Sequence, residues 1–279
     1  MLFRSLSKTA NVELPAGIAL AVILPVSAYT VGWLILAGAG AIHPWLQTAM
    51  AVYLASTTLA VRSLHQEAGR VAQALDAQDL PLARRLASRT VGRETALLEE
   101  SEVVRAAVET VAENTCDGIV APLFYLWLGG VPLALAYKAV NTLDSMVGYT
   151  SSPYRLLGWA SARLDDLANY IPARLTGLLI VAVGFCIGRG GEAWRMMRRD
   201  GRKHDSPNSG VSEAAMAGAL GVQLGGPTLY RDGVRSRPLL GEPIRPLQPA
   251  RIRQAIRMSR WVAALTVVCA LIGRAVLRA

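Results

Sequence analysis

A run of 48 consecutive residues, from Leu14 to Val61, contains no Asp, Glu, Lys or Arg. A helix needs about 20 apolar residues to cross the hydrocarbon core of a bilayer, so this run is long enough for two crossings. The chain of 279 residues is 52% hydrophobic and 18% charged, whereas soluble domains carry roughly a quarter charged residues. This composition excludes a disordered chain and a small disulfide scaffold, and it predicts an all-α, polytopic membrane protein.

The distribution of uncharged segments predicts four or five membrane-embedded helices. The dipeptide His43-Pro44 divides the long run into two spans, because proline commonly begins a new helix. The expected embedded segments lie near residues 15–40, 44–61, 119–137, 175–188 and 261–273.

The third of these segments contains Gly129-Gly130-Val131-Pro132, which predicts a break in its helix. If the segment spans the bilayer fully, residues 138–171 face outward. If the break makes it re-entrant, residues 138–171 stay on the cytoplasmic side. Three basic and three acidic side chains in 138–171 leave both alternatives open.

Charge divides the rest of the chain. Residues 189–260 carry a net charge of +8 and are expected in the cytoplasm by the positive-inside rule. The overall charge of +9 fits anionic lipid headgroups better than nucleic acid, so no nucleic-acid partner is expected. The protein is expected in the cell (inner) membrane. The predicted regions are an N-terminal membrane hairpin (1–61), a cytoplasmic helical segment with an acidic stripe (62–118), membrane or re-entrant segments with a polar core (119–188), a basic cytoplasmic loop (189–260) and a C-terminal membrane helix (261–279).

Local signals add detail to the hydrophilic regions. Asp79-Leu80-Pro81 predicts a helix start with proline at its first position. Ser212-Glu213 predicts the cap of a helix that continues through residue 226, and residues 226–250, rich in proline, predict an extended loop. Gly221 and Gly225 have the spacing of small residues at a helix–helix contact.

Three carboxylates follow one another at four-residue steps: Glu109, Glu113 and Asp117. On a helix they share one face, where like charges repel each other. Oxygen ligands of this kind are typical of Mg²⁺, which takes one or two carboxylates and shares its remaining positions with water and phosphates. The alternative is an acidic helix face exposed to solvent.

Two further polar clusters border apolar sequence. Lys138, Asn141 and Asp144 fall on one helical face, where the alternative to a functional site is a simple Lys138–Asp144 ion pair. Ionisable residues close to a membrane segment are candidates for function.

The second cluster contains an arginine, two aspartates and an asparagine, and Arg174 follows it. Neighbouring residues on a helix point about 100° apart, so one aspartate can bind a cation while the other pairs with the arginine. Its members are Arg163, Asp165, Asp166 and Asn169.

The sequence KHDSPNSG at residues 203–210 predicts a turn that leads into a helix N-terminus. Such a turn can bind phosphate through side-chain and backbone donors. The alternative is an ordinary turn. The Walker A pattern GxxxxGKS/T does not occur in the sequence, so a nucleotide site would be of another kind.

Four blocks of this sequence together resemble the CbiB/CobD family of cobalamin biosynthesis, the membrane-bound adenosylcobinamide-phosphate synthases. The blocks are VETVAENTCDGIVAPLFY (108–125), AYKAVNTLDSMVGY (136–149), GWASARLDDLANYIPARLT (158–176) and KHDSPNSGVSEAAMAGALGVQLGGP (203–227). The resemblance implies ATP- and Mg²⁺-dependent ligation of aminopropanol, aminopropanol phosphate or a related amino alcohol to the propionate carboxylate of adenosylcobyric acid. It also implies a corrinoid substrate and an active site on the cytoplasmic side of the lipid bilayer.

Within this resemblance, the polar residues of the blocks become candidate site residues. The expected catalytic residues are Asp117, Lys138, Asp144 and Asp166. The expected substrate-binding residues are Asn141, Arg163, Asn169, Arg174, Lys203, His204, Ser206 and Asn208. The expected metal ligands are Glu109, Glu113, Asp117 and Asp165. Mg²⁺ and ATP, the latter as co-substrate, are the expected cofactors.

Members of the family usually begin with a membrane segment that carries an acidic, Gly-Asp-Pro and His-Pro pattern, which this sequence does not contain. If that segment lines the active site, weak binding or inactivity is expected. Two alternatives to a ligase are a transporter and a non-catalytic membrane regulator of the same superfamily. The acidic and KHDSPN blocks favour the ligase over both alternatives. The sequence is also compatible with an oligomer.

Overall fold

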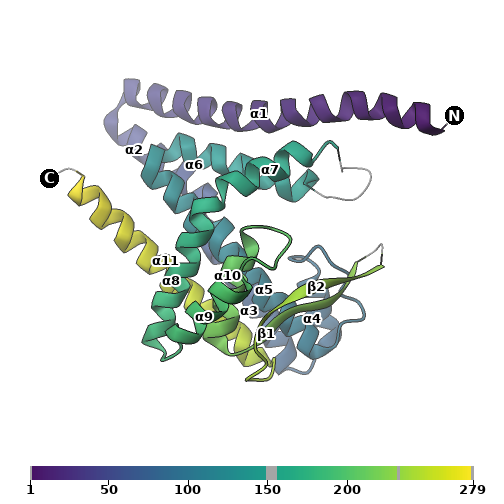
Figure 1. Cartoon of the computed structure of the whole chain (residues 1–279). Coiled ribbons are helices and arrows are strands. Elements are labelled where there is room, and N and C mark those ends of the chain that lie inside the picture. Colours follow the sequence, from purple (N-terminus) through teal and green to yellow (C-terminus); the bar gives the residue numbers. More distant parts are fainter. Residues whose placement is uncertain (1, 149–155, 231–232, 278–279) are drawn as a thin grey trace. The chain divides into compact units, whose positions relative to one another are not determined.

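A computed structural model describes residues 2–148, 156–230 and 233–277 of the chain (Figure 1). The fold is 77% helical and contains one small two-stranded sheet, which confirms the predicted all-α membrane class. The chain forms two compact units. Unit 1 contains Met1–Leu59 and Ala121–Tyr170, and unit 2 contains Ala60–Val120 and Ile171–Ala279.

Unit 1 is built from four helices. Helix α1 (Leu2–Ile42) packs against α2 (Pro44–Thr58), α6 (Ala121–Val147) and α7 (Trp159–Ala168). The predicted division at His43-Pro44 is confirmed, because His43 has extended backbone and its Nδ1 accepts a hydrogen bond from the Trp45 amide. Helix α2 has only 15 residues, fewer than the ~20 that a crossing requires. The prediction of a second full span over residues 44–61 is therefore wrong.

The predicted break in the third apolar segment is confirmed within α6. Gly129 leaves helical geometry and Gly130 adopts a φ of 71°, a conformation that favours glycine. The helix then resumes and continues to Val147. Residues 149–155 of the segment with undecided orientation lie outside the described residues.

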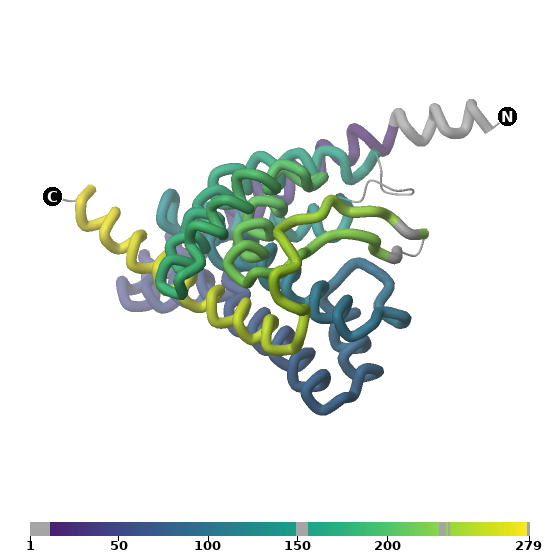
Figure 2. The backbone as a smooth tube through the Cα atoms, turned by 60° about the horizontal axis from the view of Figure 1, so that its bottom comes forward, coloured from purple at the N-terminus to yellow at the C-terminus, as the bar shows by residue number. Residues whose placement is uncertain are grey.

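Unit 2 contains the remaining elements, which Figures 1 and 2 show from two directions. They are α3 (Val61–Asp76), α4 (Leu80–Ala87), α5 (Glu100–Thr115), the π-helix η1 (Cys116–Val120), α8 (Tyr170–Cys186), α9 (Gly190–Asp200), α10 (Ser209–Leu220), β1 (Gln223–Tyr230), β2 (Gly233–Gly241) and α11 (Pro249–Val276). Helix α10 is buried from Gly210 to Leu220, so it forms the centre of this unit. Helix α5 is buried over most of its length and packs against α10 and α11.

The segment after α10 differs from its prediction. The helix ends at Leu220 because Gly221 adopts the left-handed conformation, with a φ of 70°. Strands β1 (Gln223–Tyr230) and β2 (Gly233–Gly241) then pair in an antiparallel hairpin with a bulge between Leu224 and Gly226. A helix through residue 226, an extended loop over the whole of 226–250 and a helical contact by Gly221 and Gly225 are therefore wrong.

Helix starts show both a confirmed and a corrected prediction. Asp79 caps α4, and its carboxylate accepts a hydrogen bond from the Leu82 amide at 2.8 Å. Helix α10 begins at Ser209, so the predicted cap at Ser212-Glu213 is wrong and both residues lie inside the helix.

Three helical stretches are long and apolar enough to cross a membrane: Val12–Ile42, Glu100–Val147 and Pro249–Val276. Helices α7 and α8 together give a fourth candidate, with a bend of 48° between them. Among the described residues the count is therefore three or four, which meets the predicted four or five only if α7 and α8 form one span.

Candidate functional site

A polar cavity of about 310 Å³ lies in unit 2. It is bordered by the loop that precedes α5, by the inner face of α5, by the turn before α10 and by strand β2. Its lining residues are Thr90, Val91, Gly92, Arg93, Glu109, Thr110, Glu113, His204, Asp205, Arg235, Ser236 and Arg237. The acidic residues of α5 and the KHDSPN turn, which are far apart in the sequence, thus share one cavity.

Glu109 is the buried carboxylate of this cavity, with 2% of its surface exposed. It forms ion pairs with Arg93 and with Arg237, whose Nη1 lies 3.0 Å from Glu109 Oε2. Its Oε1 accepts a hydrogen bond from the Gly225 amide at 2.8 Å. These three donors balance the charge of Glu109 and connect α5 to both strands.

Glu213 lies deeper, with 1% of its surface exposed, and both of its oxygens lie 3.2–3.3 Å from Arg237 Nη2. Burial raises the pKa of the Glu213 carboxyl well above its usual value, and the charges of Glu109 and Glu113 raise it further, while Arg237 lowers it. Arg237 therefore stabilises two buried carboxylates at once.

His204 places its imidazole between two donors. Its Nδ1 lies 3.0 Å from the Ser206 amide, and its Nε2 lies 2.5 Å from Arg237 Nη2. Burial lowers the pKa of His204, and the charge of Arg237 lowers it further. A neutral imidazole accepts at one nitrogen only, so a single tautomer satisfies one of these two donors. The ring is therefore a neutral polar group at the cavity wall.

Two groups of opposite charge in the cavity have unused hydrogen-bonding capacity. Arg93 Nη1 is buried and has no acceptor among the residues that the structure describes. Glu113 is half-buried, and its Oε1 accepts a hydrogen bond from the Ser209 hydroxyl at 3.1 Å. No ion pair of Glu113 occurs within the described ranges. A ligand that carries a phosphate and a divalent cation would satisfy both groups.

The turn before α10 is ordered by its own side chains. Ser206 Oγ accepts hydrogen bonds from the amides of Asn208 and Ser209 at 3.2 and 3.3 Å. Arg174, from α8, donates to Asn208 Oδ1 at 2.7 Å, so two of the predicted binding residues meet here. Lys203 pairs with the buried Asp200 at 2.7 Å. Many of the hydrogen-bond donors that the sequence predicted to bind phosphate therefore contact other groups of the protein instead.

Asp117 lies one helical turn beyond Glu113, but in the π-helix η1 rather than in an α-helix. π-helical turns are rare and frequently occur at functional sites. No group of three or more His, Cys, Asp or Glu side chains able to hold a metal ion occurs in the described part of the chain.

Unit 1 contains a second polar cluster, between α6 and the end of α7. Asn169 is buried, accepts a hydrogen bond from Tyr137 at 2.9 Å and donates to Asp165 at 3.0 Å. Asn141 donates to Asp165 at 3.4 Å, and Lys138 donates to Asn141 at 3.4 Å. The chain of contacts joins the second and third sequence blocks.

The two neighbouring aspartates of α7 have different partners, as their 100° separation predicts. Arg163 pairs with Asp166 at 3.5 Å, whereas Asp165 accepts from the two amides. Asp144 lies on α6 in the same unit.

The predicted site residues thus form two groups. Unit 1 contains Lys138, Asn141, Asp144, Arg163, Asp165, Asp166 and Asn169. Unit 2 contains Glu109, Glu113, Asp117, Arg174, Lys203, His204, Ser206 and Asn208.

Sequence reasoning missed Arg93 and Arg237 and gave Glu213 only a capping role. Arg93 follows Gly92 in an irregular loop, and Arg237 lies in a segment predicted to be an extended loop. Their importance depends on the hairpin, which brings Arg237 onto Glu109 across 128 residues of sequence. No local pattern around either arginine indicates these partners.

Asp200 pairs with Lys203 at the start of the KHDSPN turn, and this contact can be tested through its dependence on pH. Its buried carboxylate accepts hydrogen bonds from Arg199 and from the Gly241 amide and pairs with Lys203, and these contacts, against the cost of burial, lower its pKa to about 2. Because the pKa of Asp200 is lower in the folded protein than the value of 3.8 expected in the unfolded chain, its ionised carboxylate stabilises the fold at pH values above 3.8. This stabilisation disappears as the pH falls through about 2. Asp200→Asn should therefore cost about 2 kcal/mol at neutral pH.

The measurement is the unfolding midpoint of the wild type and of Asp200→Asn in detergent at pH 7, 5, 4, 3 and 2. The difference between them should be constant above pH 5 and shrink between pH 4 and pH 2. A difference that stays constant down to pH 2 would show that the carboxylate charge contributes nothing.

Apolar helices long enough to cross a bilayer, together with a charged cavity and a polar cluster between helices, define a polytopic membrane protein with buried ionisable groups. The sequence profile of the family described as "CobD/Cbib protein" matches residues 1–259. The chain belongs to the CobD/Cbib family.

Similar proteins carry corresponding names. The protein named "Cobalamin biosynthesis protein CobD" from Geobacter metallireducens is 54% identical over 246 residues, which cover 88% of this chain and 77% of that protein. The "Cobalamin biosynthesis protein CbiB" of Salmonella typhimurium is 48% identical over 253 residues, which cover 90% of this chain and 79% of that protein. No solved structure matches the chain.

Proposed function

We propose that this protein acts in cobalamin biosynthesis, where it ligates an amino alcohol or its phosphate to the propionate carboxylate of a corrinoid at the expense of ATP. The names of its relatives support the pathway, and the four sequence blocks support the reaction. The active site would lie on the cytoplasmic side, because the basic region 189–260 contributes to the cavity.

The observation that carries this proposal is that Arg93 lines the cavity that also contains Glu113, while the buried Nη1 of Arg93 has no acceptor among the described residues. Burial of a donor without a partner costs about 1–3 kcal/mol, so such a group indicates a ligand that accepts from it. Phosphate oxygens fit, because guanidinium groups bind phosphate strongly. Arg235 lines the same cavity, as does Arg237, which is already paired with Glu109 and Glu213.

Amide formation requires an activated carboxylate. In the proposed reaction, an oxygen of the corrinoid carboxylate attacks the γ-phosphorus of ATP, and ADP leaves. The amine nitrogen then attacks the acyl carbon, phosphate leaves, and the nitrogen loses one proton. Arg93 would hold phosphate oxygens through Nη1, while its Nη2 remains paired with Glu109. The departing phosphate or water would take up that proton, and neutral His204 would remain a polar group of the cavity wall, since both of its ring nitrogens face protein donors.

Magnesium fits this cavity as a nucleotide-bound ion. Mg²⁺ commonly takes one or two protein carboxylates together with substrate phosphates. Glu113 and Asp205 line the cavity, and neither pairs with a guanidinium group among the described residues; of the two, Glu113 lies on α5 beside Glu109. The ion would neutralise phosphate charge. Asp117, one turn further along, would be the second protein ligand.

The polar cluster of unit 1 would contribute to substrate binding. Lys138 and Asn141 carry donors suited to a carboxylate or a phosphate, and Asp166 and Asp144 carry acceptors suited to a protonated amine. Support for this assignment comes from the family blocks to which these residues belong.

The test is an assay of the detergent-purified chain with adenosylcobyric acid, aminopropanol phosphate, ATP and Mg²⁺, in which mass spectrometry follows the corrin product. The expected product has the mass of the corrinoid plus the amino alcohol minus water, and its formation should stop without ATP. No product with aminopropanol, its phosphate or ethanolamine would contradict the ligase. Flux of a corrinoid into liposomes without product would favour a transporter.

A further inference from the structure

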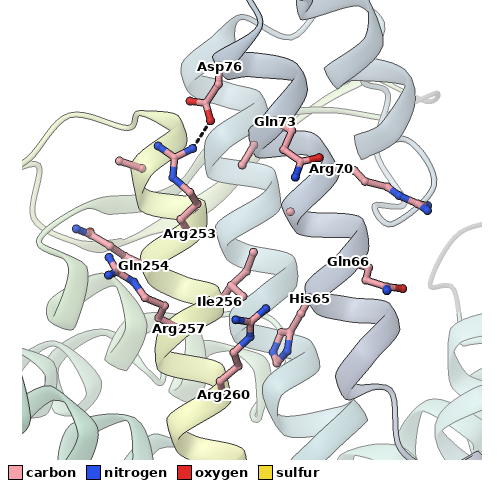
Figure 3. Close-up of a pocket in the computed structure, with 13 residues that line it drawn as sticks. His65, Gln66, Arg70, Gln73, Asp76, Arg253, Gln254, Ile256, Arg257 and Arg260 are labelled. Carbon is pink, nitrogen blue, oxygen red and sulfur yellow. Dashed lines mark hydrogen bonds and ion pairs between the residues drawn. The ribbon is translucent and has the colours of Figure 1, made fainter.

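A basic groove lies between α3 and α11 in unit 2, apart from the residues of the proposed reaction. The groove has a volume of about 680 Å³ (Figure 3). Four arginines line it: Arg70, Arg253, Arg257 and Arg260. Asp76 is the acidic residue in its lining and pairs with Arg253, and Arg70 pairs with Glu67, so the excess of positive charge in the groove is that of Arg257 and Arg260.

The arginines of α11 differ in their partners. Arg253 is paired with Asp76 at one end of the groove (Figure 3). Arg257 and Arg260 are exposed, and neither forms an ion pair in the part of the chain that the structure describes. Two guanidinium groups within one helical turn thus have capacity for an anion.

The opposite wall of the groove contributes neutral donors. Gln66 and Gln73 of α3 line this wall, whereas Gln254 lies on α11 beside Arg257 (Figure 3). His65 is buried and contacts Ser259 at 3.0 Å, and burial together with the charge of Arg260 lowers the pKa of its imidazole. A neutral His65 adds no compensating charge, so the groove combines charged and neutral donors, as phosphate sites commonly do.

The position of the groove on α11 indicates where its ligand comes from. Pro249–Val276 is long and apolar enough to cross a membrane, and its apolar part begins directly after Arg260. Trp261 is 67% exposed, and exposed tryptophan at this position is typical of the membrane–water interface. The C-terminal turns of α11 extend away from the rest of unit 2 (Figure 2) and expose Val268, Leu271 and Ile272. Arg257 and Arg260 therefore lie at the level of lipid headgroups.

We propose that the α3–α11 groove binds the phosphate of an anionic phospholipid headgroup through Arg257 and Arg260. Basic pockets between helices at the cytoplasmic membrane surface are suited to such headgroups. A headgroup bound here would fix the depth at which α11 enters the bilayer and would hold α3 beside it. This site is independent of the proposed ligase reaction.

The test uses the full chain in nanodiscs of phosphatidylcholine with one fifth phosphatidylglycerol, followed by native mass spectrometry of the lipids that remain bound. Wild type should retain phosphatidylglycerol over phosphatidylcholine, and Arg257→Gln/Arg260→Gln should lower that retention at least fivefold. The matched control is Arg202→Gln/Arg274→Gln, which removes the same charge from exposed positions outside the groove and should retain lipid like wild type. Arg257→Lys/Arg260→Lys keeps the charge and should retain at least half of the lipid.

Three results would overturn the proposal. Equal loss of lipid in the groove variant and in the control variant would mean that only total charge matters. Equal retention of the two phospholipids by wild type would mean that the groove does not select an anionic headgroup. Displacement of the lipid by millimolar glycerol 3-phosphate or ATP, with loss of that competition in the groove variant, would identify a soluble phosphate as the ligand. Circular dichroism and the unfolding midpoint establish that each variant is folded, and the lysine variant keeps the test decisive if the glutamine variant unfolds.

Discussion

Glu113→Gln should lower the rate of the proposed ATP-dependent formation of a corrinoid amide by about 100-fold or more, because glutamine cannot supply the negative charge that would hold a divalent cation on the nucleotide. Loss of one electrostatic group that acts on the transition state costs about 10²–10³ in rate. Glu113 is half-buried and contacts Ser209, a contact that the glutamine oxygen can keep, so the fold should remain intact. The measurement is the rate of product formation at saturating ATP and Mg²⁺.

Glu100→Gln is the matched control for this variant. Glu100 lies on the same helix α5, in its exposed first turn, and the substitution removes the same charge. Its rate should stay within a factor of two of wild type. If Glu113→Gln keeps more than a tenth of the wild-type rate while Glu100→Gln behaves as expected, Glu113 does not hold the cation.

Arg237→Met will lower the stability of the protein by about 3 kcal/mol, because it leaves the buried Glu213 without its guanidinium partner. Glu109 keeps Arg93 and the Gly225 amide, so the loss is concentrated at Glu213. The unfolding midpoint should fall by roughly 6–12 °C. The deficit should grow as the pH rises through the raised pKa of Glu213, because Glu213 without Arg237 must remain protonated or be buried as a charge.

The double variant Arg237→Met/Glu213→Gln distinguishes this cause from a general loss of packing. Glutamine at 213 removes the buried charge, so the double variant should recover most of the midpoint and lose the dependence on pH. A double variant that is less stable than Arg237→Met alone would show that Glu213 is not the source of the deficit.

The sequence predicted the helical membrane class because long uncharged segments have few other solutions in water or lipid. The sequence also predicted the places where neighbouring residues determine the backbone conformation, such as helix starts and breaks. The corner at His43-Pro44, the break at Gly129-Gly130 and the start of α4 at Asp79 depend on residues within a few positions. Each of these features is confirmed.

The hairpin was not predictable in the same way. The two segments contain Pro227, Pro238 and several glycines, a composition typical of a loop. They are strands because they pair with each other, and a local pattern does not show this pairing. The charge network around Glu109 follows from that pairing. A helix pattern can place Glu109 and Glu113 on one face. It cannot show that Arg93 from a loop and Arg237 from a strand neutralise Glu109, while Glu113 accepts a hydrogen bond from the neutral Ser209 hydroxyl and has no ion pair among the described residues.

The hydrogen bonds of Glu109 to Gly225 and Arg237 join residues 116 and 128 positions apart in the chain. Contacts of such sequence separation form late, since a long loop must close before they stabilise the fold. During synthesis, α5 is therefore made well before the strands that complete its charge balance. A nascent chain that ends before residue 237 holds Glu109 without that balance, and the cavity acquires its final electrostatics only when the second strand has been translated.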